Sequence, residues 1–208
     1  MPIALALPDG APPAIPVVVI EDAADAAPLA RALLAGGIRV IEVTLRSTAA
    51  LAAIKAIATD VPDMFVGAGT LLSPEDMAQA AAAGAQFLVS PGATQSLINC
   101  GIASQLPFLP GVATASEAMA LREVGFRRMK FFPADAAGGI AGLKGLGGPL
   151  PDLAFCPTGG VGADNAAAYL ALDNVFAVGG SWLAPAAAIR ARDWRRIETL
   201  AAEAARLA

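Results

Sequence analysis

Short apolar runs recur along the chain, with alanine-rich segments of mixed polarity between them. The runs are rich in β-branched and aromatic residues, and their spacing fits one strand, one helix and two short loops. Continuous apolar strands that alternate with helices are typical of a parallel sheet whose faces are covered. The pattern therefore predicts an α/β fold with eight strands, at residues 16–20, 38–43, 64–69, 86–90, 107–111, 129–132, 153–156 and 175–180.

Two of the intervening segments carry clear helix-start signals. Ser73 is a candidate N-cap, with Pro74 at the first helical position and Asp76 three residues after the cap. Thr114 and Glu117 repeat the cap pattern at the start of a later segment. Both signals follow a predicted strand closely, as expected for βα units.

Eight such units in about 190 residues fit a compact barrel. We therefore predict a single-domain (β/α)8 TIM barrel over residues 16–208, preceded by an N-terminal lead-in over residues 1–15. The alternative is an open doubly wound sheet, which usually has fewer strands and often a glycine-rich turn after the first one. That turn is absent here. In a barrel, functional residues lie at the carboxyl ends of the strands and in the loops that follow.

Composition narrows the range of partners. The hydrophobic fraction of 56% comes from alanine and from short interrupted runs, and not from the 18 or so consecutive apolar residues of a membrane helix. The first 16 residues lack a basic region and are interrupted by Pro8, Pro12 and Pro13, which argues against a secretory signal. The net charge of −4, without a basic run, argues against nucleic-acid binding. We expect a soluble protein whose partners are small molecules or other protein chains.

The chain contains no histidine and two cysteines, Cys100 and Cys156, which lack metal-ligand spacing. The usual zinc ligand and the usual general base are therefore both missing. We expect each cysteine to be a small buried apolar group. Acid/base chemistry must then depend on carboxylates, lysine, tyrosine or water.

Lys130 is the most unusual candidate for chemistry, because it lies inside the apolar run 129–132 of a chain with few lysines. One interpretation is that its stem lies along apolar surface while its ammonium group reaches solvent. The other is burial at the mouth of the barrel, where apolar surroundings favour a neutral amine. Such an amine attacks carbonyl carbon, so this position predicts Schiff-base chemistry.

Polar residues at the ends of the second and third strands complete the candidate centre. Glu42 lies in the second predicted strand, where it could neutralise Arg39, Arg46 or Lys130, or act as an acid/base group, and these interpretations are compatible. Arg46 and Thr70 could bind an anion such as a carboxylate, although Arg46 could also be a solvated loop charge.

Glycine and hydroxyl residues follow the last two strands, where barrels often bind phosphate through backbone N–H groups. Tight βα turns also use glycine, so each cluster is a weak signal alone, but two on adjacent strands favour anion binding. The residues are Thr158, Gly159, Gly160, Gly179, Gly180 and Ser181.

Seven segments together carry a family resemblance. They are VIEVTLRS, VGAGTLLSPED, FLVSPG, LPGVATASEAM, KFFPAD, FCPTGGV and VGGSWLAP, in order and at fitting spacing over most of residues 16–185. The chain resembles the 2-keto-3-deoxy-6-phosphogluconate (KDPG) aldolases, a class I aldolase family that includes 4-hydroxy-2-oxoglutarate (KHG) aldolase activity.

The resemblance implies a role for each matching residue. Lys130 corresponds to the Schiff-base lysine and Glu42 to the general acid/base. Arg46 and Thr70 correspond to positions that bind the pyruvyl carboxylate. Pro91 and Phe132 correspond to positions that line the site, and the glycine and hydroxyl residues after the last two strands correspond to the phosphate-binding loops.

The implied reaction is cleavage of 2-dehydro-3-deoxy-6-phosphogluconate to pyruvate and D-glyceraldehyde 3-phosphate, as in the Entner–Doudoroff pathway, with side activity on 4-hydroxy-2-oxoglutarate. The family is typically a cytoplasmic homotrimer that needs no metal or organic cofactor. One departure concerns phosphate binding, because many relatives place a basic residue after the first strand where this chain has Glu21 and Asp22. A phosphosugar isomerase or epimerase, which needs no isolated lysine, and a non-enzymatic anion-binding barrel are the alternatives.

Overall fold

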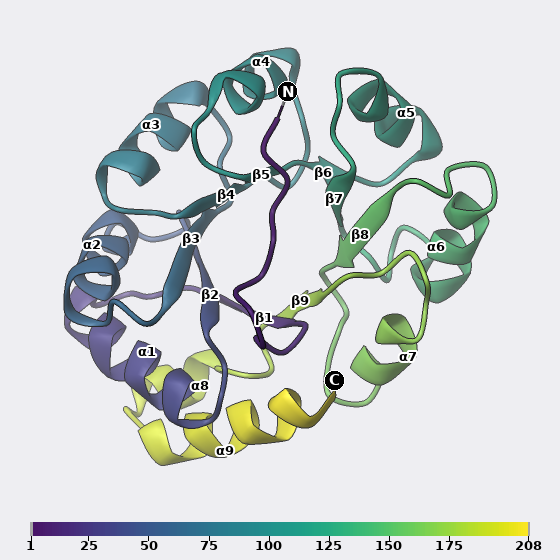
Figure 1. The fold of residues 1–208 in the computed structure, drawn as a ribbon. Helices are drawn as coiled ribbons and strands as arrows, with labels where there is room; N and C mark the ends of the chain where they lie inside the picture. Colours follow the sequence, from purple (N-terminus) through teal and green to yellow (C-terminus); the bar gives the residue numbers. More distant parts are fainter. Residues whose placement is uncertain (1, 208) are drawn as a thin grey trace.

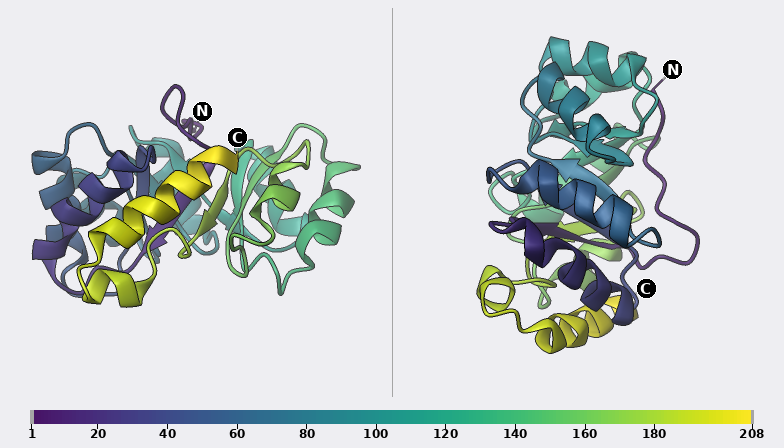
Figure 2. Two further views of the ribbon diagram at one scale, coloured as in Figure 1. Left: turned by 90° about the horizontal axis from the view of Figure 1, so that it is seen from below. Right: turned by 90° about the vertical axis from the view of Figure 1, so that its left-hand side faces the viewer.

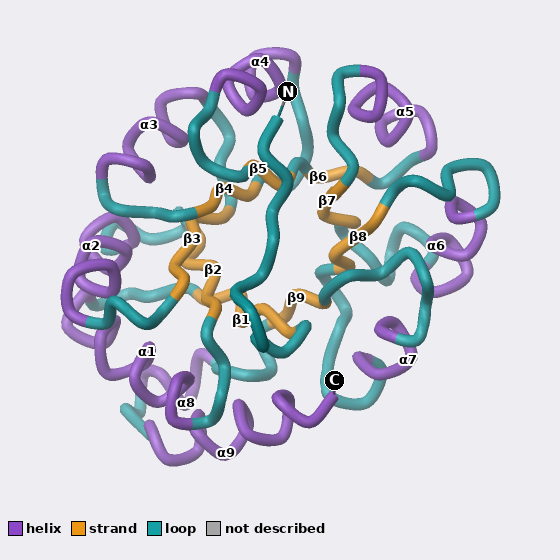
Figure 3. Tube along the Cα trace, in the orientation of Figure 1, coloured by secondary structure: helices purple, strands orange, loops and turns teal. Residues whose placement is uncertain are grey.

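Residues 2–207 are described by a computed structural model, in which parallel strands ring a centre and helices lie outside them (Figures 1 and 3). The predicted alternation of strands and helices is confirmed. The strands are β1 (Ala14–Val18), β2 (Val40–Thr44), β3 (Phe65–Gly69), β4 (Phe87–Val89), β5 (Phe108–Leu109), β6 (Gly111–Val112), β7 (Arg128–Phe131), β8 (Ala154–Pro157) and β9 (Val178–Gly180).

The α-helices bury apolar faces against the strands, as the alanine-rich segments predict. They are α1 (Ala26–Ala35), α2 (Ala50–Asp60), α3 (Pro74–Ala82), α4 (Gln95–Ala103), α5 (Ala115–Glu123), α6 (Gly139–Gly147), α7 (Ala166–Leu170), α8 (Ala186–Arg190) and α9 (Trp194–Ala204), with the 3-10 turns η1 (Ala23–Asp25) and η2 (Ala205–Leu207). No helix in residues 2–207 has the length and apolar character needed to cross a membrane.

Helices α3 and α5 begin where the sequence predicts. The amide of Asp76 donates to Oγ of Ser73 at 3.1 Å, and the Asp76 carboxylate accepts from the amide of Ser73 at 3.1 Å. Thr114 and Glu117 form the same reciprocal capping box at the start of α5. Each box satisfies amides that the first helical turn leaves without partners, which fixes where the preceding loop ends.

The parallel ladder is divided into two sheets. One has the order β5-β4-β3-β2-β1-β9 and the other the order β6-β7-β8. Between β5 and β6 lies Pro110, which has no amide to donate, and the chain changes its pairing there from β4 to β7. On the other side, isolated bridges join Phe155 to Val175 and Thr158 to Gly179. The predicted α/β architecture with a parallel sheet is confirmed, whereas a continuous eight-stranded ladder is not formed.

The N-terminal segment crosses one end of the ring of strands (Figure 1), and the side view in Figure 2 shows it along that end. Its Leu5 is fully buried. The guanidinium of Arg128 donates to the carbonyl of Leu5 and lies 4.7 Å from the centre of the Phe176 ring. The buried members of this apolar cluster come mainly from the strands and are Leu5, Ile15, Val40, Phe87, Val89, Leu109, Cys156 and Ala177. We call it the floor cluster.

Candidate active site

A cavity of about 410 Å³ opens at the carboxyl ends of the strands, the end of the ring opposite the floor cluster. This is where a fold of this class places its functional residues. All the predicted site residues except Gly179 line it, namely Glu42, Arg46, Thr70, Pro91, Lys130, Phe132, Thr158, Gly159, Gly160, Gly180 and Ser181.

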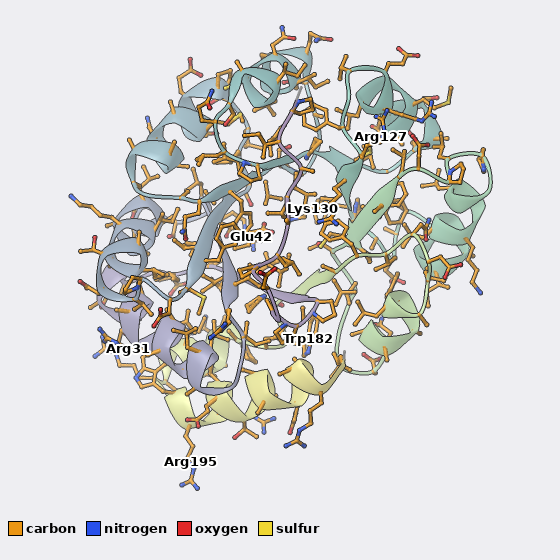
Figure 4. The ribbon with its side chains drawn as sticks, viewed as in Figure 1. Arg31, Glu42, Arg127, Lys130, Trp182 and Arg195 are labelled. Atoms are coloured by element: carbon orange, nitrogen blue, oxygen red, sulfur yellow. The ribbon has the colours of Figure 1, made fainter. Side chains whose placement is uncertain are left out.

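Lys130 and Glu42 meet at the inner end of the cavity (Figure 4). They come from β7 and β2, strands of different sheets, and point toward each other across the ring. Lys130 Nζ lies 3.0 Å from Glu42 Oε1 and 3.4 Å from Oε2. Only 5% of Lys130 and 3% of Glu42 are exposed. The interpretation of Lys130 as a residue that reaches solvent is therefore wrong, and of the three cations considered for Glu42, Lys130 is its partner.

An aromatic ring and a buried thiol surround Lys130. Its Nζ lies 5.5 Å from the centre of the Phe132 ring, within the range of a cation–π contact. Beside it on β8 is Cys156, which belongs to the floor cluster. Burial raises the pKa of the Cys156 thiol to about 12, so this group stays protonated and unreactive at neutral pH. The prediction of a buried cysteine is confirmed for Cys156, whereas Cys100 is partly exposed.

Arg46 is held at the cavity wall by a chain of two hydrogen bonds. Its Nε donates to Oγ1 of Thr44 at 3.2 Å, and that hydroxyl donates to the carbonyl of Val18 at 2.9 Å. Among residues 2–207, Arg46 and Lys130 are the cations that line the cavity. Arg46 is exposed in the loop after β2 and lines the cavity, so its role in binding an anion stays a prediction.

Thr70, on the same wall, has an unusual backbone. Its φ of 59° lies in the left-handed region, which a β-branched residue rarely adopts because of steric strain. Strain of this kind costs about 1–3 kcal/mol and is concentrated at functional sites. The conformation places a threonine where glycine would be the easier choice, which points to a use for its hydroxyl group.

The opposite wall is built from the loops after β8 and β9. Gly159 and Gly160 have φ values of 93° and 80°, a conformation that favours glycine and lets the backbone approach an anion closely. Gly179 lies behind Thr158, where a Cβ atom would stand 2.5 Å from the threonine Oγ1. Gly179 thus supports the wall without lining it.

The acidic residues after the first strand do not line this cavity. Asp22 accepts a hydrogen bond from the amide of Ala24 at 3.0 Å, and its other carboxylate oxygen lies 3.3 Å from Arg192. Asp25 accepts from Nε of the same arginine at 2.7 Å. Together with Glu21 they line a separate cavity near α8. The departure at positions 21 and 22 therefore adds no carboxylate to the walls of the site.

Three residues that line the cavity are missing from the predicted set, namely Val17, Thr44 and Val161. For Thr44 a signal existed, since strand alternation places it on the same side as Glu42. Val17 and Val161 are ordinary apolar residues and carry no such signal.

Comparisons with known proteins agree with the geometry. Residues 11–200 match the family model described as Aldolase: KDPG and KHG aldolase. A 2-dehydro-3-deoxy-phosphogluconate aldolase of Pseudoalteromonas atlantica is 52% identical over 192 residues, covering 92% of this chain and 89% of the relative.

Solved structures agree as well. The KDPG aldolase of Legionella pneumophila, with pyruvate captured at low pH as a covalent carbinolamine intermediate, has a TM-score of 0.91 and 47% identity over 93% of this chain and 94% of that one. The 2-keto-3-deoxy-6-phosphogluconate aldolase of Zymomonas mobilis ZM4 with 3-phosphoglycerate has a TM-score of 0.90 and 45% identity over 95% and 92%. The chain belongs to the KDPG and KHG aldolase family.

Proposed function

We propose that this protein is a class I aldolase that cleaves 2-dehydro-3-deoxy-6-phosphogluconate to pyruvate and D-glyceraldehyde 3-phosphate. The observation that carries the proposal is the contact of 3.0 Å between Lys130 and Glu42, both buried at the inner end of a cavity that is open to small molecules. A lysine amine with a carboxylate beside it can form a covalent bond to a ketone and exchange protons with the product of that bond.

The first half of the reaction forms the iminium. Glu42 accepts the proton of the Lys130 ammonium, and the free amine attacks the C2 ketone to give a carbinolamine, the species captured in the Legionella enzyme with pyruvate. Loss of water from the carbinolamine leaves a protonated iminium. When the C3–C4 bond breaks, its electron pair moves toward the positive nitrogen of the iminium. A neutral ketone oxygen accepts these electrons less readily.

The second half breaks the carbon–carbon bond. Glu42, directly or through a water molecule, removes the proton of the C4 hydroxyl while the C3–C4 electrons move into the iminium. C4 leaves as the aldehyde of glyceraldehyde 3-phosphate, and an enamine remains on Lys130. Glu42 returns a proton to C3, and hydrolysis then releases pyruvate and restores the amine with the water lost earlier.

The two walls of the cavity bind the two anionic ends of the substrate. Arg46 and Thr70 face the C1 carboxylate, with Pro91 and Phe132 flanking the reacting carbons. The phosphate lies against the other wall, formed by Thr158, Gly159, Gly160, Gly180 and Ser181 with Gly179 behind them. The 3-phosphoglycerate in the Zymomonas structure, which carries both a carboxylate and a phosphate, supports this arrangement.

We further propose that the two sheets act as one closed (β/α)8 barrel, with β5 and β6 as the halves of its fifth strand. Support comes from the single residue between β5 and β6 and from two isolated bridges, which join Phe155 of β8 to Val175 and Thr158 to Gly179 of β9. A single domain with an N-terminal lead-in, a cytoplasmic location and a homotrimeric state are further predictions from the sequence and the family resemblance.

The proposed function is tested by the mass of the purified protein after incubation with pyruvate and borohydride. A single reduced pyruvyl adduct is expected, and peptide mapping should locate it on Lys130. A coupled assay with 2-dehydro-3-deoxy-6-phosphogluconate should then detect release of both products. Folded protein without an adduct would overturn the aldolase proposal and favour a phosphosugar isomerase instead.

A prediction for substrate binding concerns Thr44. Changing Thr44→Val keeps the shape of the side chain but removes the hydroxyl that links Arg46 to Val18. One such hydrogen bond contributes about 1–1.5 kcal/mol, so the KM for substrate should rise about 10-fold while kcat stays within about threefold. Steady-state kinetics measure both values, and Thr44→Ser, which keeps the hydroxyl, should behave like the wild type. An unchanged KM in Thr44→Val would show that Arg46 does not need this support.

A further inference from the structure

The carboxylate of Glu42 lies directly against the backbone of Gly69. Gly69 is the last residue of β3, the strand that pairs with β2, and stands opposite Thr44 in the register. A Cβ atom added at Gly69 would lie 2.1 Å from Oε1 of Glu42 and 2.7 Å from both Cδ and Cγ. These are the three atoms nearest to the added Cβ, so Glu42 is the first group that any side chain at position 69 would displace.

The backbone of Gly69 does not itself require glycine. Gly69 lies in a regular strand and is not among the residues with positive φ. Gly159 and Gly160 differ, because their left-handed backbones would strain any other residue. An alanine at position 69 would therefore suit the backbone of the strand, and the Glu42 side chain is the nearest group in its way.

The Glu42 side chain lies close to Gly69 because it must extend to Lys130. Its partner Lys130 belongs to the other sheet, so the glutamate extends across the ring to bring Oε1 within 3.0 Å of Nζ. In doing so it lies over β3 at Gly69. A methyl group there would force the Glu42 side chain to move, which disturbs the buried pair with Lys130 and shifts the group that transfers protons.

We propose that Gly69 is a positioning residue of the reaction, whose missing side chain allows the Glu42 carboxylate to lie against Lys130. The proposal rests on the proposed role of Glu42 in proton transfer. A displacement of about 1 Å in a reacting group can lower a rate by about 100-fold. Gly69→Ala should therefore slow proton transfer strongly and leave binding of pyruvate nearly unchanged, because Arg46 and Lys130 keep their places.

The experiment has a structural and a kinetic part. In a crystal structure of unliganded Gly69→Ala, the Glu42 carboxylate should no longer contact Nζ of Lys130. Exchange of the pyruvate methyl protons for deuterium, followed by NMR at saturating pyruvate, should be about 10-fold to 100-fold slower than in the wild type. The pyruvate concentration for half-maximal exchange should change by less than about threefold, which a general loss of structure would not produce.

The matched control is Gly145→Ala. Gly145 is an exposed glycine of α6 with no atom within 4 Å of an added Cβ, so this variant should exchange at the wild-type rate. A second comparison uses Glu42→Ala, which removes Cγ, Cδ and Oε1, the three atoms nearest to the added Cβ. In that background Gly69→Ala should lower the remaining exchange rate by a much smaller factor than it does with Glu42 present, because the two positions act through one contact.

Retention of the Glu42–Lys130 contact in Gly69→Ala, with exchange within about twofold of the wild type, would overturn the proposal. An equal fold-loss of the exchange rate from Gly69→Ala in the wild type and in the Glu42→Ala variant would overturn it too, since the effect would not pass through the Glu42 side chain. Failure of the proposed function is a separate result, because wild-type protein would then form no borohydride-trapped adduct. The crystal structure of the variant would still decide whether position 69 controls Glu42.

Discussion

Changing Lys130→Ala should abolish both the pyruvate adduct and cleavage of the substrate. The amine is the only group proposed to bond to the C2 ketone, and the thiol beside it is held in its unreactive form by burial. Removal of a covalent nucleophile should lower kcat by a factor on the order of 10⁵ or more. Intact mass after pyruvate and borohydride measures the adduct, and a coupled assay for pyruvate measures turnover.

Two further variants make this result interpretable. Loss of Lys130 leaves Glu42 buried without its partner, which costs about 3–5 kcal/mol when a buried pair is broken. If Lys130→Ala unfolds, Lys130→Met takes its place in the test, because methionine fills the space of the lysine stem. Lys130→Met should also be inactive. Lys144, exposed on α6, is the control, and Lys144→Ala should keep both adduct and turnover. A pyruvyl adduct on folded Lys130→Met would show that another group is the nucleophile.

Changing Glu42→Gln should separate covalent bond formation from proton transfer. The amide has nearly the same shape and still lies beside Lys130, but it cannot act as a general base. The pyruvate adduct should still form, while exchange of the methyl protons and cleavage should slow by about 10²–10⁴-fold. NMR of the exchange in deuterated buffer measures the first effect and the coupled assay the second.

The control for this change is Glu203→Gln, at an exposed position of α9, which should exchange protons at the wild-type rate. Exchange at that rate in Glu42→Gln would remove Glu42 from the mechanism. Loss of the adduct in folded Glu42→Gln would instead assign Glu42 to an earlier step, the formation of the free amine.

The sequence predicts the strands well because each one is buried on both faces and therefore reads as a short apolar run. The fifth run, 107–111, shows the limit of this signal. Pro110 lies within it, and a proline cannot donate to a ladder, yet the periodic spacing alone suggests one unbroken strand. Which neighbour each half pairs with depends on strands far away in the chain, so the division into two sheets was not predicted.

The candidate site, too, could be predicted only in part from the sequence. Lys130 and Glu42 were identifiable because a charged residue in an apolar run needs a reason, but three cations remained possible partners for Glu42. The choice depends on two strands 88 residues apart that face each other across the ring, and local patterns do not hold that information. Strand alternation places Thr44 on the same side as Glu42, but its hydrogen bonds to Arg46 and Val18 depend on the folded arrangement and are not visible in the sequence.

The floor cluster also determines when the site can be completed as the chain is made. Leu5 leaves the ribosome long before Cys156 and Ala177, which belong to the same cluster. The strand that follows Leu5 has a similar delay, since Ala14 pairs with Val178. Synthesis must therefore pass residue 178 before the end of the ring beneath Lys130 can close, and until then the apolar side chains of this cluster are open to chaperones and to other nascent chains.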